Sequence, residues 1–99
     1  MKPLSELPHL FFNLMEELNE VALEASKCMR FTPNHFSEVK GNTNWGSLNY
    51  EYNDLLAVFE LLEERHGLKL EVDRTLIEAK KVKMAKLMNV ARELGALEQ

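Results

Sequence analysis

The residues best suited to chemistry in this 99-residue chain are two pairs of acids, each spaced three residues apart. Glu17 and Glu20 form the first pair, and Glu51 and Asp54 form the second. On a helix this spacing places both side chains of a pair on one face, one turn apart. Four converging carboxylates need positive compensation, which a hard divalent cation with oxygen ligands supplies. We therefore predict that these four residues bind Mg²⁺, with Mn²⁺ as a possible substitute.

The position of Glu51 within its helix is the strongest sign that these acids converge. A helix is expected from Gly46 or Ser47 to His66, and on its helical wheel Glu51 lies inside the apolar stripe, with Asp54 on the border. The alternative is that both acid pairs lie on solvated helix faces. That alternative explains Glu17 and Glu20 on their own, but it does not explain an acid within an apolar stripe.

The elements that must position these acids are three long amphipathic helices. Apolar periodicity predicts them over about residues 10–31, 46–66 and 74–94. Residues 1–9 are expected to be a lead-in, and the segment Thr32–Trp45 is expected to be mostly loop, with a short helical turn after Pro33. The first apolar stripe comprises Phe11, Leu14, Leu18, Val21, Ala25 and Cys28, and the last comprises Ile77, Met84, Leu87, Met88 and Ala91.

This pattern predicts a single all-α domain over residues 1–99, with an antiparallel bundle of three long helices over about residues 10–94 and a short helix or loop insert. A chain of this size buries only about two-thirds of the surface that its unfolded form exposes. A substrate pocket would strain such a small monomer. We therefore expect oligomerisation to complete the bundle.

Composition argues against several other classes of protein. The formal net charge is -4 and there is no basic run, which argues against binding to a nucleic-acid polymer. No apolar run is long enough to span a bilayer and the start is not a signal peptide, so a cytoplasmic location is expected. The single cysteine, Cys28, lies on an apolar stripe, and no two histidines have metal-ligand spacing. A Gly-rich phosphate loop is also absent from the sequence.

The two acidic motifs and the residues that follow them resemble those of MazG-like all-α nucleoside triphosphate pyrophosphohydrolases of the small stand-alone type. The family is marked by Glu-Glu-x-x-Glu on one helix and Glu-x-x-Asp on the next. Here these motifs are Glu16-Glu17-Leu18-Asn19-Glu20 and Glu51-Tyr52-Asn53-Asp54. The resemblance extends over residues 10–94, and the interval from Val21 to Tyr50 is slightly longer than is usual in the family.

The resemblance implies hydrolysis of a (d)NTP to a (d)NMP and pyrophosphate by a metal-activated water, in a homodimer or homotetramer. It assigns Glu17, Glu20, Glu51 and Asp54 to the metal, and Glu16 and Glu24 to supporting roles. A triphosphate also needs cations, for which Lys27 is the first choice by its position on the helix face, followed by Arg30, Lys80 and Lys83. Asn44 and Trp45, next to Asn42, are the candidates for contacts with the base.

Two other functions remain compatible with the sequence. One is a non-catalytic helical adaptor whose acidic surface binds a partner protein. The other is an enzyme with the same acid cluster that acts on a different pyrophosphate-containing substrate, such as a phosphoribosyl nucleotide. A response to divalent metal separates the adaptor from the enzymes, and a substrate panel separates the two enzymes from each other.

Overall fold

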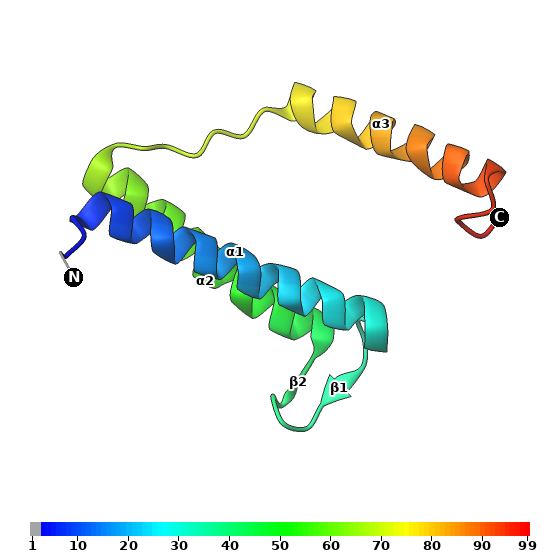
Figure 1. Ribbon diagram of the computed structural model, residues 1–99, viewed down its shortest axis with the longest axis horizontal. Helices are drawn as coiled ribbons and strands as arrows, with labels where there is room; N and C mark the ends of the chain where they lie inside the picture. The colour runs from blue at the N-terminus through cyan, green and yellow to red at the C-terminus, as the bar shows by residue number, and fades with distance from the viewer. Residues whose placement is uncertain (1–2) are drawn as a thin grey trace.

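The computed structural model describes residues 3–99 and has an all-α architecture, as predicted (Figure 1). Its helices are α1 (Glu6–Phe31), α2 (Asn44–His66) and α3 (Arg74–Glu93). Two short strands, β1 (Phe36–Ser37) and β2 (Asn42–Thr43), form an antiparallel hairpin between α1 and α2. Within residues 3–99, no helix is both long and apolar enough to cross a membrane.

Helices α1 and α2 lie side by side and antiparallel, and polar contacts join the two helices at both ends. At one end Arg65 of α2 forms a two-pronged ion pair with Glu6 of α1, and His66 Nε2 lies 3.2 Å from the same carboxylate. The hydrogen bond and charge of Arg65 hold the pKa of Glu6 at about 2. At the other end the Asn44 side-chain amide donates to the Thr32 carbonyl over 2.9 Å.

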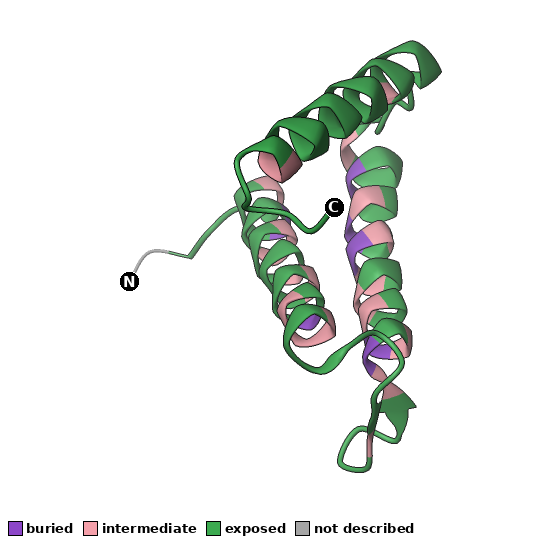
Figure 2. Ribbon diagram, turned by 90° about the vertical axis from the view of Figure 1, so that its right-hand side faces the viewer, coloured by how far each residue is buried: buried purple, intermediate pink, exposed green. Residues whose placement is uncertain are grey.

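The seam between α1 and α2 has an apolar half and a polar half. In the apolar half, Leu10 meets Val58 and Leu62, all three of which are buried. Val58 and Leu62 are four residues apart, which places them on one face of α2. Steps of seven residues lead along α1 from Leu10 to Glu17 and Glu24, and steps of three and four residues lead along α2 from Val58 to Ser47 and Asn44. The polar half of the seam is therefore part of the same helix contact. Figure 2 shows that the buried positions fall on α1 and α2 and none on α3.

The first two helices both begin earlier than the sequence pattern predicts. Helix α1 starts at Glu6 instead of Leu10, because Pro8 lies in the first turn, where its missing N–H leaves no internal hydrogen bond unmade. Helix α2 starts at Asn44, with the Thr43 hydroxyl accepting a hydrogen bond from the Gly46 N–H. The predicted C-cap of α2 is confirmed at Gly67, whose φ of 67° is the left-handed conformation that favours glycine.

The predicted short helical turn after Pro33 is wrong, because the segment forms a β-hairpin instead. Phe36 pairs with Thr43, and Ser37 pairs with Asn42. Gly41 adopts a positive φ of 68° within the turn, and its N–H donates to the Ser37 carbonyl over 2.8 Å. A left-handed residue closes a tight turn that a continuing helix could not make. The hairpin projects from the ends of α1 and α2 (Figure 1).

Helix α3 forms as predicted but stands away from the other two helices (Figure 1). The Asp73 carboxylate caps its start by accepting from the N–H groups of Thr75 and Leu76. No residue of α3 is buried, and the radius of gyration of 17.7 Å exceeds the roughly 13 Å of a compact 100-residue domain. A single chain therefore supplies the three helices of the expected bundle, but only α1 and α2 pack together.

Part of the predicted apolar stripe of α1 is exposed to solvent. Phe11 is 42% exposed and Leu18 is 47% exposed, whereas Leu10, one position from Phe11, is only 6% exposed. The face of α1 that packs on α2 is therefore rotated from the predicted stripe. As a result, a second apolar face of α1 has no partner within the described part of the chain.

A leucine truncation tests the packing of the seam. Leu62→Ala should lower the free energy of unfolding by about 2–5 kcal/mol, because it leaves a cavity among the buried side chains. Leu61→Ala, next to it but 40% exposed, is the matched control and should cost much less. The measurement is urea denaturation monitored by circular dichroism, and equal losses in the two variants would contradict the seam.

Candidate acidic metal site

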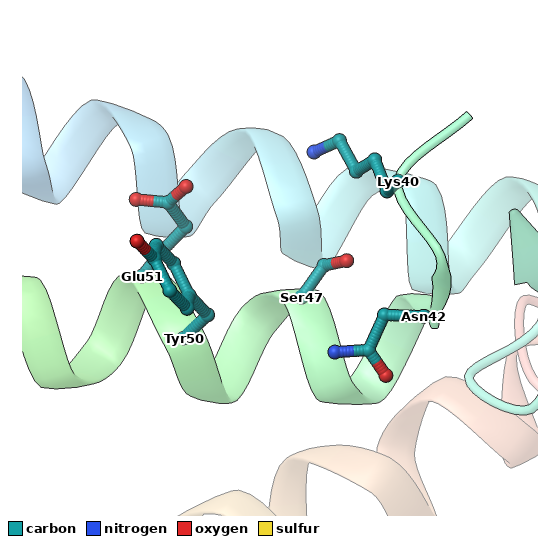
Figure 3. A pocket seen from close by; sticks show the side chains of 5 residues that line it. All are labelled: Lys40, Asn42, Ser47, Tyr50 and Glu51. Atoms are coloured by element: carbon teal, nitrogen blue, oxygen red, sulfur yellow. The ribbon is translucent and has the colours of Figure 1, made fainter.

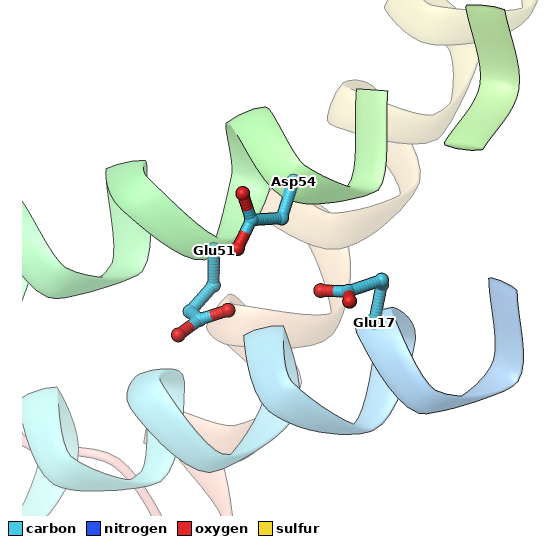
Figure 4. Close-up of side chains that lie close together, drawn as sticks. All are labelled: Glu17, Glu51 and Asp54. Carbon is cyan, nitrogen blue, oxygen red and sulfur yellow. The ribbon is translucent and has the colours of Figure 1, made fainter. Parts of the chain in front are cut away.

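Three of the four predicted acids meet between α1 and α2. One carboxylate oxygen each from Glu17, Glu51 and Asp54 lies within 4.8 Å of the other two (Figure 4). Glu17 comes from α1, and Glu51 and Asp54 come from successive turns of α2. The prediction that the two acidic motifs face each other is thus correct for these three residues.

The fourth predicted acid, Glu20, borders this cluster without belonging to its tightest part. Its side chain is exposed, and it is not one of the three whose oxygens converge. Its negative charge nevertheless acts on Glu51. Glu16, to which the resemblance assigns a supporting role, is exposed.

Burial and the neighbouring acids raise the pKa of Glu51 above its ordinary value. Burial is the largest cause, followed by the negative charges of Asp54, Glu20, Glu17 and Glu24. Both causes disfavour the charged form of the carboxyl group. The site therefore concentrates negative charge that no neighbouring lysine or arginine fully offsets.

Glu24 is the most deeply buried charged residue of the described chain, with 0% of its surface exposed. Two ammonium groups compensate it: that of Lys40, in the turn between β1 and β2, and that of Lys27, which lies 3.4 Å away on α1. Burial acts to raise the pKa of Glu24, but the hydrogen bond and charge of Lys40, together with Lys27, bring it below its usual value. Glu24 therefore remains an anion inside the seam.

Two carboxylate oxygens in this region are enclosed and have no hydrogen-bond partner, namely Oε2 of Glu17 and Oε2 of Glu24. An enclosed carboxylate oxygen without a donor is costly unless something positive satisfies it. The donor set around Glu17 consists of carboxylate oxygens alone, which suits Mg²⁺ or Mn²⁺ better than a softer metal. The residues therefore fit a hard divalent cation held by Glu17, Glu51 and Asp54.

An open hollow of about 260 Å³ adjoins the cluster (Figure 3). Glu51 lines it from the acid side, and Lys40 lines it from the β-hairpin. Asn42, Ser47 and Tyr50 complete the wall with polar groups. A small ligand in this hollow would touch a carboxylate of the cluster and an ammonium group together.

The predicted phosphate-binding cations divide into two groups. Lys27 is half-buried beside Glu24, and the Arg30 guanidinium lies 5.2 Å from the centre of the Phe31 ring, so both are near the hairpin end of α1. Lys80 and Lys83 are exposed on α3, which stands away from the acid cluster of its own chain. Only the first group is placed near the site within one chain.

The residues predicted to contact a base do not line the hollow next to Glu51. Asn44 is 4% exposed, and its amide is committed to the Thr32 carbonyl, so it holds the hairpin to α1. Trp45 is 55% exposed, and its backbone N–H donates to the Pro33 carbonyl. Both residues fasten the loop, and the hollow takes its polar wall from Asn42 and Ser47 instead.

Sequence reasoning missed Lys40. It is 16 residues from Glu24 and lies in a loop without periodicity, so no spacing rule connects the two. The available signal was chemical: a glutamate on the seam of a helix pair needs a cation nearby, and Lys40 is one of few basic residues between the two acidic motifs.

Comparisons with known proteins identify no relative. No protein-family model matches the chain, and no curated protein or solved structure gives a significant match. The function must therefore be argued from the site itself.

The raised pKa of Glu51 predicts how stability varies with pH. The folded protein binds this proton more tightly than the unfolded chain does, so Glu51 lowers stability as the pH rises through its folded pKa. With a chelator present, Glu51→Gln should be more stable than the wild type at pH 7, and the difference should shrink as the pH falls toward 4. Urea denaturation across this pH range is the measurement.

Glu60→Gln removes an exposed acid from the same helix and is the matched control, for which little change is expected. If Glu51→Gln and Glu60→Gln have the same small effect at every pH, the charge of Glu51 does not destabilise the fold.

Proposed function

We propose that this protein is a Mg²⁺-dependent nucleoside triphosphate pyrophosphohydrolase. The observation that carries the proposal is the convergence of Glu17, Glu51 and Asp54 oxygens within 4.8 Å, inside a helix seam and next to an open hollow. The enclosed and unpartnered Oε2 of Glu17 supports a cation at this place. The resemblance of both acidic motifs to MazG-like enzymes supplies the reaction.

A divalent ion at this site would neutralise phosphate charge and lower the pKa of a coordinated water. In the proposed reaction a bond forms between the water oxygen and the α-phosphorus, and the bond from that phosphorus to the bridging oxygen breaks. The bridging oxygen leaves with the electron pair as part of pyrophosphate. One carboxylate of the cluster would accept the water proton.

The matching test combines metal binding with turnover. Mg²⁺ or Mn²⁺ at about 100 times its dissociation constant should stabilise the wild type by about 2.7 kcal/mol. Glu51→Gln should reduce kcat by a factor of about 10² or more without loss of helix content, because it removes a carboxylate that would hold the ion. Glu60→Gln should retain full activity. A panel of canonical and modified triphosphates, with pyrophosphate detection, provides the assay.

Each alternative gives a different result in these experiments. A non-catalytic adaptor would show no stabilisation by metal and no pyrophosphate release from any substrate. An enzyme for phosphoribosyl nucleotides would bind the metal and release pyrophosphate only from that class. Full turnover in Glu51→Gln would remove Glu51 from the mechanism.

We further propose that the active form is a homo-oligomer in which α3 of one copy packs on α1 of another. Helix α3 exposes Met84, Leu87 and Met88, and α1 exposes Phe11 and Leu18. The charges are complementary, because α1 and α2 together carry ten acids against three lysines and arginines, whereas α3 carries six lysines and arginines against two acids. Such packing would bring Lys80 and Lys83 close to the acidic helices of the other copy.

Oligomerisation through α3 predicts that Leu87→Asp lowers the molar mass in solution to that of one chain, because the substitution places a charge within the apolar contact. Asn89→Asp makes a similar charge change on the polar side of α3 and should leave the assembly intact. Size-exclusion chromatography with light scattering measures both. A wild type that is monomeric would contradict the proposal.

A further inference from the structure

A second hollow lies next to the first one, with Lys40 lining both. Its wall also includes Lys27 and His35, with Phe31, Ser37 and the buried Asn44 completing it. The volume is about 220 Å³. None of the acids of the metal cluster lines this second hollow, and Lys27 and Lys40 are the lysines in its wall.

The charge along the α1–α2 pair therefore changes sign toward the β-hairpin. Glu17, Glu51 and Asp54 lie near the middle of the helices, whereas Lys27 and Lys40 lie near the hairpin end. The buried Glu24 offsets only one of the two ammonium charges, so this trio keeps a net positive charge. Arg30, which lies 5.2 Å from the centre of the Phe31 ring, adds another cation at the rim.

Glu24 pairs with both lysines. Its side chain is 1% exposed, and the two ion pairs restrict the rotational freedom of each lysine before any ligand arrives. Both lysine side chains remain partly exposed, at 26% for Lys27 and 39% for Lys40. Cations ordered in advance bind an anion at lower entropic cost than mobile surface lysines do.

We propose that the hollow between Lys27 and Lys40 is an anion subsite that takes the two terminal phosphates of the substrate, and afterwards the pyrophosphate product. This inference rests on the proposed function for the direction in which the substrate lies. The α-phosphorus would then lie over the acid cluster, with the leaving group directed toward the β-hairpin. Lys40, which lines both hollows, would neutralise the negative charge that develops on the leaving oxygen.

Inorganic pyrophosphate is the probe, because it needs neither a base nor turnover. Titration calorimetry with the full chain should detect binding, and Lys40→Met should weaken it at least tenfold. Lys69→Met removes a lysine from the connector before α3, away from both hollows, and should bind as the wild type does. Absence of pyrophosphate binding by the wild type, with and without Mg²⁺, would overturn the proposal.

Lys40→Met also leaves Glu24 with one counter-charge fewer, so a purely structural role for Lys40 needs its own control. Glu24→Gln removes the buried charge while keeping the shape of the side chain. If Lys40 contacts the ligand, Glu24→Gln with Lys40→Met should still bind pyrophosphate at least tenfold more weakly than Glu24→Gln alone. Equal affinity in those two proteins would show that Lys40 is only a partner of Glu24.

The same titrations separate this proposal from the proposed function. Mn²⁺ binding that depends on Glu51 tests the acid cluster, whereas pyrophosphate binding that depends on Lys40 tests the subsite. A protein that binds pyrophosphate through Lys40 but binds no Mn²⁺ would keep the subsite and lose the pyrophosphohydrolase. A protein that binds Mn²⁺ but no pyrophosphate would overturn the subsite and keep the proposed metal site.

Discussion

The contact between α1 and α2 fixes the positions of both the apolar core and the acidic cluster. Leucines and a valine fill one half of the seam, and the burial of Leu10, Val58 and Leu62 holds the two helices in register. That register fixes where Glu17 and Glu51 face each other further along the same seam. Apolar packing at one end therefore provides the free energy that keeps mutually repelling carboxylates together at the other.

The polar half of the seam divides its charges into two environments. Glu24 is enclosed and has two lysine partners, so it is a permanent anion that orders the cations around it. Glu51 is partly buried beside like-charged neighbours, and both conditions disfavour its charged form. The first arrangement ties the β-hairpin to α1, and the second leaves a negatively charged cluster that the proposed cation would neutralise.

Helices α1 and α3 each expose an apolar face to solvent. Helix α3 is regular and well capped by Asp73, yet it buries no residue in one chain, and α1 likewise exposes Phe11 and Leu18. Isolated helices gain little stability from propensity alone, and most of it comes from packing an apolar face. In the proposed homo-oligomer, a second copy of the chain would cover both apolar faces and pair the acidic helices with a basic one.

The sequence alone determined the helices and the two acidic motifs, because periodicity and helix geometry are local: the 3.6-residue repeat placed Glu51 within an apolar stripe, and Gly67 and Asp73 marked helix ends. Only the tertiary structure decided which face of α1 packs on α2, since the chain carries two apolar stripes and local spacing cannot choose between them. It also converted a predicted helical turn into a β-hairpin and brought Lys40 to Glu24. That contact joins residues distant in sequence, and it arises from the need to neutralise a buried charge, which no local pattern encodes.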